Sequence, residues 1–309
     1  MEHDCHILCN FTYHIILSQM KSGILFSLLI AMAIFTANAQ SKSLKTFLQP
    51  DWYQGSSVQY GNNPSAGHYV QADDAKIYYE TYGEGSPIVM LHGGGVGCTY
   101  EWGEMIDSLS KTNTIIAVST RGHGKSEIGT EPISYEQRAK DVYAVIQDAI
   151  PGQTTTIMGF SDGGYTAYKV ASLYPEIINK IITIGAGEIK PETRKFQLAT
   201  VDYMKKIDPD FMETQTAIMP EPGRLQEYWN EFYAFYNNLT VSKELFMSLQ
   251  CPVLVMAGEV DPNAPLTTII AAYQMIPNSQ LAIIANAGHG CFIDNFAAVW
   301  ANIVPFLNQ

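Results

Sequence analysis

One serine in this chain lies in a pattern that suits a nucleophile. Ser161 is the centre of Gly159-Phe160-Ser161-Asp162-Gly163, a G-x-S-x-G pentapeptide that follows the apolar run Thr154–Met158 and opens a helical pattern. A sharp turn between a strand and a helix exposes such a serine, and glycines let the backbone pack closely around it. The pentapeptide alone can arise by chance, but the strand before it and the helix after it predict that Ser161 is a nucleophile.

A serine hydroxyl is a poor nucleophile at neutral pH and needs a general base within hydrogen-bond reach. His289 is the only histidine downstream of Ser161, in the sequence Asn286-Ala287-Gly288-His289-Gly290 just past the last strand-like run. A histidine in a surface loop is the ordinary alternative. Its uniqueness and its place at a strand's carboxyl end favour His289 as the base.

The base in turn needs a carboxylate to orient it. Asp261 ends Met256-Ala257-Gly258-Glu259-Val260-Asp261, directly after the run Val253–Met256, and Glu259 is its competitor. The order serine, aspartate, histidine is the one that a strand–turn–helix nucleophile predicts. We therefore expect Asp261 to be the acid in preference to Glu259.

Acyl transfer also needs hydrogen-bond donors for the developing oxyanion. His92-Gly93-Gly94-Gly95 follows the run Ile88–Leu91 and can offer backbone N–H groups without steric bulk. We expect the two donors to be the N–H groups of Asp162 and Gly94, with Gly95 as the alternative to Gly94. His92 is expected to brace the loop.

The elements that must position these residues alternate between strand-like and helical patterns. Apolar runs of this length suit strands that are covered on both faces, and alternation with helices predicts a mostly parallel sheet. The expected strands are 67–71, 76–82, 88–91, 114–118, 154–158, 180–184, 253–256 and 280–285. The expected helices are 135–150, 162–173, 265–276 and 296–307.

Residues 190–248 break this alternation because they hold no strand-like run. Within them, 224–236 carries apolar side chains at helical spacing, which predicts a helical cap inserted into the main domain. The apolar residues of this stripe are Leu225, Trp229, Phe232, Tyr233 and Tyr236. We expect most of them only to fix the cap to the domain.

The first forty residues read as a targeting segment. Lys21 precedes the apolar run 24–35, and Ala37-Asn38-Ala39 then gives a small-residue cleavage site, which predicts a secretory signal peptide over 20–39. A membrane anchor is the alternative, but the run is shorter than the ~20 residues that span a bilayer. We expect residues 1–19 to be an upstream extension, 40–66 a loose N-terminal arm and 67–309 the folded domain. The predicted location is secreted or periplasmic, with no membrane contact after cleavage.

Charge and motifs narrow the possible partners. The net charge of −12 argues against nucleic acid, because an acidic surface repels phosphate backbones. Gly93–Gly97 fails the dinucleotide pattern, and Gly124-Lys125-Ser126 lacks the upstream glycine of a P-loop, since that position is Ser119. We expect no cofactor and no metal, and the sequence does not predict an oligomeric state. Cys98 and Cys291 each follow an active-site loop, and we hypothesise that they form a disulfide.

Five motifs together resemble the α/β-hydrolase superfamily over residues 67–309. They are His92-Gly93-Gly94-Gly95, Arg121-Gly122-His123-Gly124-Lys125-Ser126, the pentapeptide around Ser161, Gly258-Glu259-Val260-Asp261 and Gly288-His289. The resemblance implies an α/β-hydrolase fold, a mostly parallel sheet with helices on both faces and a helical cap.

The pentapeptide with its following Gly164 is similar to that of the valacyclovir-hydrolase-like (biphenyl-hydrolase-related) branch. That branch cleaves α-amino-acid esters, and its aspartate after the nucleophile helps to bind the substrate ammonium group. The resemblance therefore implies a substrate-binding role for Asp162. The alternative is that Asp162 caps its own helix, where exposed N–H groups favour a carboxylate.

Three functions remain open. The first is a serine hydrolase for a small-molecule carboxylic ester, including amino-acid esters and lactones. The second is an exopeptidase of the proline-iminopeptidase kind for short peptides, which would need Glu213, Glu221 or Glu227 to face the pocket. The third is a non-catalytic small-molecule binding protein, against which the complete set of Ser161, Asp261 and His289 weighs. Ser161 also excludes relatives that use aspartate as the nucleophile.

Overall fold

The computed structural model describes residues 42–191 and 195–309. The predicted upstream extension (1–19) and signal peptide (20–39) lie outside the described residues. Within the described part, no helix combines the length and the apolar character that crossing a membrane requires.

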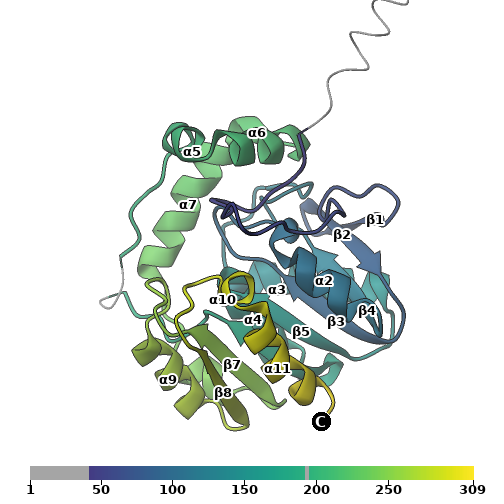
Figure 1. Ribbon diagram of the computed structural model, residues 1–309, viewed down its shortest axis with the longest axis vertical. Helices are drawn as coiled ribbons and strands as arrows, with labels where there is room; N and C mark the ends of the chain where they lie inside the picture. Colours follow the sequence, from purple (N-terminus) through teal and green to yellow (C-terminus); the bar gives the residue numbers. More distant parts are fainter. Residues whose placement is uncertain (1–41, 192–194) are drawn as a thin grey trace, which may run out of the picture. The chain divides into compact units, whose positions relative to one another are not determined.

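An eight-stranded sheet forms the centre of the described chain (Figure 1). Its strands are β1 (Gly67–Ala72), β2 (Ala75–Tyr82), β3 (Ser86–Leu91), β4 (Asn113–Val118), β5 (Thr155–Phe160), β6 (Ile178–Ile184), β7 (Val253–Gly258) and β8 (Ser279–Ile284). Their order is β1-β2-β4-β3-β5-β6-β7-β8. β2 pairs antiparallel with β1 and β4, and every other pair is parallel. The predicted mostly parallel sheet is therefore confirmed, and each predicted strand is present with ends that differ by a few residues.

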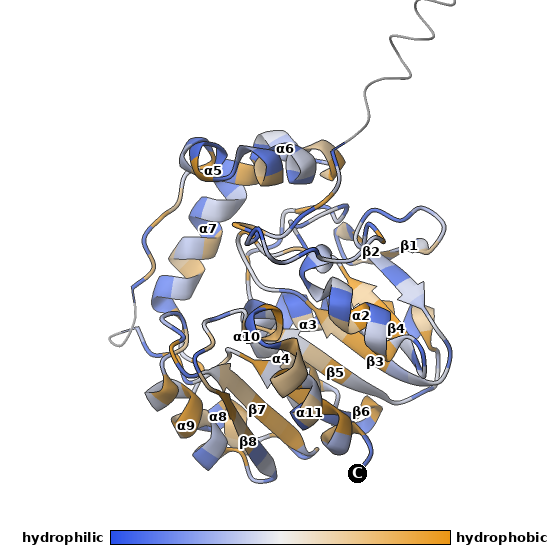
Figure 2. Ribbon diagram, viewed as in Figure 1, coloured by the Kyte–Doolittle hydropathy of each residue, from blue (hydrophilic) through white to orange (hydrophobic). Residues whose placement is uncertain are grey.

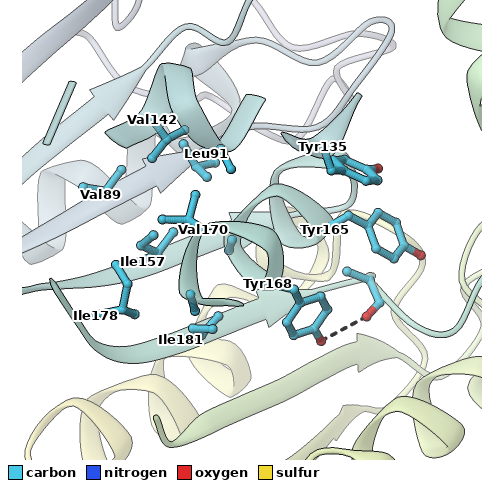
Figure 3. Close-up of a cluster of buried hydrophobic side chains, with 14 of the residues drawn as sticks. Val89, Leu91, Tyr135, Val142, Ile157, Tyr165, Tyr168, Val170, Ile178 and Ile181 are labelled. Carbon is cyan, nitrogen blue, oxygen red and sulfur yellow. Dashed lines mark hydrogen bonds between the residues drawn. The ribbon is translucent and has the colours of Figure 1, made fainter. Parts of the chain in front are cut away.

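Successive strand residues point to opposite faces of the sheet. Both faces are covered by helices. Val89, Leu91 and Ile157 pack with α3 (Tyr135–Ala149) and α4 (Asp162–Leu173), as Figure 3 shows. Their neighbours Ile88 and Met90 belong to the other core cluster. That cluster contains residues of α2 (Gly103–Leu109) and α11 (Phe296–Leu307), whereas α9 (Leu266–Met275) contributes to the cluster that contains α3 and α4.

The insertion is helical, as predicted. Its described helices are α5 (Val201–Ile207), α6 (Pro209–Ile218), α7 (Leu225–Asn238) and α8 (Lys243–Met247), and short 3-10 turns lie at Pro222–Arg224 and, outside the insertion, at Thr99–Trp102 and Pro175–Ile177. Figure 2 shows hydrophilic and hydrophobic residues alternating along α7. Leu225 and Trp229 pack in the core, as expected. Phe232, Tyr233 and Tyr236 also line a cavity, so the expectation that most of the stripe serves only to fix the cap was wrong for these three.

The segment before β1 is packed and not loose. Leu44, Tyr53 and Tyr60 are buried. Glu80 of β2, itself buried, accepts hydrogen bonds from the N–H groups of Gly61 and Asn63, each at 2.7 Å. The polar composition of 40–66 concealed this because a few buried aromatic residues and one internal acceptor are enough to hold the backbone. The last turn of the chain before α11 is the short helix α10 (Cys291–Asp294).

Candidate active site

Ser161 lies at a strained turn between β5 and α4. Its backbone is held at φ +50° and ψ −114°, and its N–H donates to the Ile184 carbonyl at 2.7 Å. A Cβ on Gly159 would lie 2.3 Å from the Gly163 carbonyl oxygen, and one on Gly163 would lie 2.3 Å from that of Leu91. No side chain fits at such distances, so the glycines of the pentapeptide are required by packing. Strain of this kind concentrates at functional sites, where the surrounding structure enforces it.

His289 and Asp261 form a hydrogen-bonded pair. His289 Nδ1 lies 2.7 Å from Asp261 Oδ2. Asp261 Oδ1 accepts the N–H groups of Asn263 and Ala264, at 2.7 and 2.9 Å. Burial alone would raise the pKa of Asp261, but His289 and these N–H groups hold that pKa below its ordinary value. The competing Glu259 is exposed and accepts the N–H of Asn286 instead, so the geometry selects Asp261.

Gly185, which sequence reasoning missed, keeps room for this pair. Its φ is +66°, and a Cβ there would lie 2.8 Å from His289 Cε1 and 3.4 Å from Asp261 Oδ2. The signal was present in the sequence, since Gly185 directly follows the predicted strand 180–184. It lacked a motif that would have linked it to the histidine.

Ser161 and the His289 imidazole lie at one cavity of about 550 Å³. The glycine loop 93–97 lines the same cavity. The loops after β3 and β5 meet here because the strand order reverses between these neighbours, which is where open α/β sheets bind ligands. Most of the other lining side chains are apolar or aromatic. They are Phe47, Leu48, Val96, Phe160, Phe196, Met204, Phe232, Tyr233, Tyr236 and Ile293.

The glycine loop and the serine turn contact each other closely. A Cβ on Gly94 would lie 2.9 Å from Asp162 Cβ. Within the described residues, the N–H groups of Gly94 and Asp162 have no acceptor in the protein, as is usual at a helix N-terminus. Gly94 lines the cavity and Asp162 lies next to it, so these two unpaired donors can bind an oxyanion.

His92 braces this loop, as expected. Its Nδ1 lies 2.7 Å from the Gly93 carbonyl oxygen, and its Nε2 accepts the Thr120 N–H at 3.0 Å. Burial lowers the pKa of His92 to about 4, so the ring is neutral at physiological pH. This arrangement fits the tautomer with the proton on Nδ1.

Glu101 is a second residue that sequence reasoning missed. It is buried, lines the cavity and accepts the Gly93 N–H at 2.6 Å. Burial raises the pKa of Glu101 to about 8. No sequence motif indicates it, because its role depends on the return of the Thr99–Trp102 turn to the loop.

The structure does not offer the Asp162 carboxylate to a substrate. The side chain is fully buried, forms an ion pair with Arg138, and accepts the hydroxyls of Tyr135 and Tyr236 at 3.0 and 2.9 Å. All of these partners are side chains, so Asp162 does not cap α4 either. Both readings of this carboxylate are therefore corrected: an ammonium group would have to displace Arg138.

Two further expectations fail. Cys98 and Cys291 are both free thiols, and burial raises the pKa of each. The cap glutamates do not line the cavity: Glu221 accepts the Ile128 N–H and pairs with Arg224, both at 2.7 Å. Glu213 and Glu227 also lie outside the cavity lining.

The chain is similar in sequence to a known protein family and to several hydrolases. Residues 87–218 match the family described as the alpha/beta hydrolase fold. The chain is 25% identical to a 2-hydroxymuconate semialdehyde hydrolase of Pseudomonas sp. (strain CF600), over 80% of this chain and 96% of that protein. It is 24% identical to the human serine hydrolase BPHL, over 78% of this chain and 87% of that protein.

A solved structure shares the fold. The crystal structure of a serine hydrolase involved in carbazole degradation (CarC enzyme) superposes with a TM-score of 0.67 at 22% identity. The match covers 78% of this chain and 98% of that one. The chain therefore shares the fold of that structure.

Proposed function

We propose that this chain, which belongs to the α/β-hydrolase superfamily, is a serine hydrolase that cleaves a carboxylic ester through an acyl-enzyme on Ser161. The observation that carries the proposal is the His289–Asp261 pair, which faces the same cavity as the strained Ser161. A binding protein would have no need of this combination. The human relative is named a serine hydrolase, which agrees with the nucleophile we assign.

The proposed reaction proceeds in two halves. His289 takes the proton from the Ser161 hydroxyl as the oxygen attacks the ester carbonyl carbon, and the N–H groups of Gly94 and Asp162 stabilise the oxyanion. The tetrahedral intermediate collapses, the bond to the alkoxide oxygen breaks, and His289 protonates the leaving alcohol. Water, deprotonated by His289, then attacks the acyl-enzyme and releases the acid and Ser161. Asp261 holds the imidazole and stabilises its protonated form throughout.

Features of the cavity favour an ester over a peptide. An exopeptidase needs an acidic group to bind the free amino terminus, and the cap glutamates that could serve lie outside the cavity lining. The Asp162 carboxylate is already neutralised by Arg138. The apolar lining suits an acyl or alkyl group without charge.

A second candidate is hydrolysis of a carbon–carbon bond, which the name of the Pseudomonas relative suggests. Its substrate, a hydroxymuconate derivative, carries a carboxylate. Among the described residues that line the cavity there is no lysine or arginine to pair with that carboxylate. This electrostatic mismatch makes the ester the better proposal.

The test is a parallel rate comparison on the purified chain. The substrates are a nitrophenyl butyrate, an alanine ester, a prolyl arylamide and 2-hydroxymuconate semialdehyde, each with wild-type protein and Ser161→Ala. The proposal predicts hydrolysis of the butyrate that Ser161→Ala abolishes, while the exposed Ser65→Ala control keeps it. Cleavage of only the arylamide or only the semialdehyde would replace it with the corresponding alternative.

We further propose that the chain is exported and that its mature form begins near Gln40. The support is the pattern of basic residue, apolar run and Ala37-Asn38-Ala39. Amino-terminal sequencing of the protein recovered from cells would test this. An amino terminus upstream of residue 24 would contradict it.

A further inference from the structure

We propose that residues 43–49, which we call the strap, form a wall of the cavity and select substrates with an extended apolar acyl chain. This inference rests on the proposed ester hydrolysis, and it names the substrate class of that site. The strap precedes the first strand and lies outside the matched family region at 87–218. No motif in the sequence connects it with Ser161.

The strap contributes side chains to the cavity itself. Thr46, Phe47 and Leu48 line the same cavity as Ser161 and His289. Leu48 is more than half exposed, at 56%, although it is strongly apolar. Its backbone also lies in the left-handed region, at φ +51°, which is unfavourable for a branched residue such as leucine. A strained apolar side chain held partly open to solvent at a cavity is suited to contact an apolar ligand.

One buried carboxylate ties the strap to the cap. Asp208, which is 5% exposed, accepts the Leu48 N–H at 2.8 Å and the Lys45 ammonium at 2.9 Å. The same side chain accepts the Phe211 N–H at 3.1 Å and so caps α6. Burial would raise the pKa of Asp208, but the hydrogen bonds and the charge of Lys45 hold that pKa below its ordinary value. Asp208 is therefore ionised at neutral pH and holds both elements at once.

Apolar contacts fix the strap at its two ends. The ring of Phe47 packs edge-on against Phe211 of the cap, with centroids 5.4 Å apart. Leu44 is buried in the core cluster on the α2 side of the sheet. The strap thus contacts both the core of the domain and the cap, and Thr46, Phe47 and Leu48 line the cavity.

The chemistry of the wall indicates the ligand. Phe47 and Leu48 from the strap meet Met204 and Tyr233 from the cap along the cavity, and none of these carries a charge. An acetyl group would reach few of these side chains. An extended alkyl chain would contact and bury them.

The experiment compares nitrophenyl acetate with nitrophenyl octanoate on wild type, Phe47→Ala, Leu48→Ala and Asp208→Ala. The matched control is Trp52→Ala, because Trp52 is exposed, follows the strap by three residues and does not line the cavity. We expect kcat/KM for octanoate to fall about tenfold in Phe47→Ala and Leu48→Ala, the effect of about 1.4 kcal/mol. The value for acetate should fall several-fold less, so that the octanoate-to-acetate ratio drops, and Trp52→Ala should change neither value.

Asp208→Ala tests whether the position of the strap matters, and not only the contacts of its side chains. It removes the anchor of the strap without altering a residue that lines the cavity. We expect it to lower the octanoate-to-acetate ratio in the same direction. Circular dichroism establishes that each variant is folded. An unchanged ratio in folded Phe47→Ala and Leu48→Ala would overturn the proposal.

A binding measurement keeps this inference separate from the proposed function. In Ser161→Ala, calorimetry with the neutral ketone 2-nonanone should give a Kd that Leu48→Ala and Phe47→Ala raise and Trp52→Ala does not. If wild type hydrolyses no ester but Leu48→Ala and Phe47→Ala still raise the Kd for 2-nonanone, the proposed ester hydrolysis is wrong and the proposed role of the strap is supported. If esters are hydrolysed but the two strap variants leave the Kd for 2-nonanone unchanged, the ester hydrolysis is supported and the proposed role of the strap is wrong.

Discussion

The loops at the carboxyl end of the sheet and the cap with its strap build the same cavity by different means. At the sheet, backbone geometry positions the reacting groups: Ser161 is held at φ +50°, and Gly185 at φ +66° leaves space for His289. In the cap and strap, aromatic and aliphatic side chains supply the wall, and Asp208 ties them together. The difference indicates that the rigid sheet fixes the reaction, while the cap and strap set which substrate enters.

The two regions meet at Asp162. Its backbone N–H belongs to the proposed oxyanion site, and its carboxylate accepts the hydroxyl of Tyr236 from α7. Arg138 of α3 completes this buried cluster and also donates to Tyr228 of α7 at 2.8 Å. The cap is thus attached at the residue that follows the nucleophile, so damage to the cluster should affect both regions.

The largest effect on activity should come from filling the space beside His289. Gly185→Ala would place a methyl group 2.8 Å from His289 Cε1, and we expect a loss of about 100-fold in kcat because the base is displaced. Gly152→Ala is the matched control, since Gly152 has a similar φ of +72° with no atom within 4 Å of the added Cβ. Both should lose about 1 kcal/mol of stability, measured by urea unfolding. Equal activity in the two variants would show that Gly185 does not position the base.

The largest effect on stability should come from removing the buried charge of Asp162. Asp162→Asn leaves Arg138 without its counter-ion, and we expect the free energy of unfolding to fall by about 3–5 kcal/mol. Tyr236→Phe removes one hydroxyl from the same carboxylate and should cost only about 1 kcal/mol. Chemical denaturation measures both. A stable Asp162→Asn that specifically lost activity on an amino-acid ester would restore the ammonium-binding role.

A further effect should be a change in the pH dependence of stability at Glu101. The unfolded chain releases this proton near the ordinary value of a glutamate, whereas the folded chain keeps it to about pH 8. The native state therefore binds more protons between these values, and the free energy of unfolding falls as the pH rises through this window. Glu101→Gln keeps an acceptor for the Gly93 N–H and removes the proton, so its melting temperature should decline less than that of wild type. Parallel slopes for the two proteins would contradict the assignment.

Much of the sheet, and the meeting of Ser161 and His289 at one cavity, could be predicted from the sequence because both depend on local signals. Apolar runs such as Val253–Met256 mark buried strands, and the glycines around Ser161 are required by a turn that involves only neighbouring residues. The order of Ser161, Asp261 and His289 then follows from the positions of the loops. Some ends of elements differ from the prediction. The strand β5, for example, continues to Phe160, one residue before Ser161.

What could not be predicted depends on contacts between distant residues. The partners of Asp162 are Arg138, Tyr135 and Tyr236, which are 24 to 74 residues away in sequence. The similarity of the pentapeptide around Ser161 does not reveal these partners and therefore predicts that the carboxylate binds a substrate. The strap was expected to be loose because its anchor Asp208 is 160 residues from Leu48. Glu101 reaches Gly93 only after the Thr99–Trp102 turn has formed.

The central claim is that Ser161 is the nucleophile, and covalent labelling tests it most directly. A fluorophosphonate should add one phosphonyl group to the wild-type chain, with tandem mass spectrometry placing it on Ser161. Ser161→Ala should remain unlabelled, and His289→Gln should label at least about 100-fold more slowly because the base is missing. Labelling of wild type at Ser161 with loss of esterase activity in the same time course would support the account. Full esterase activity with Ser161 unlabelled, or undiminished activity in Ser161→Ala, would contradict it.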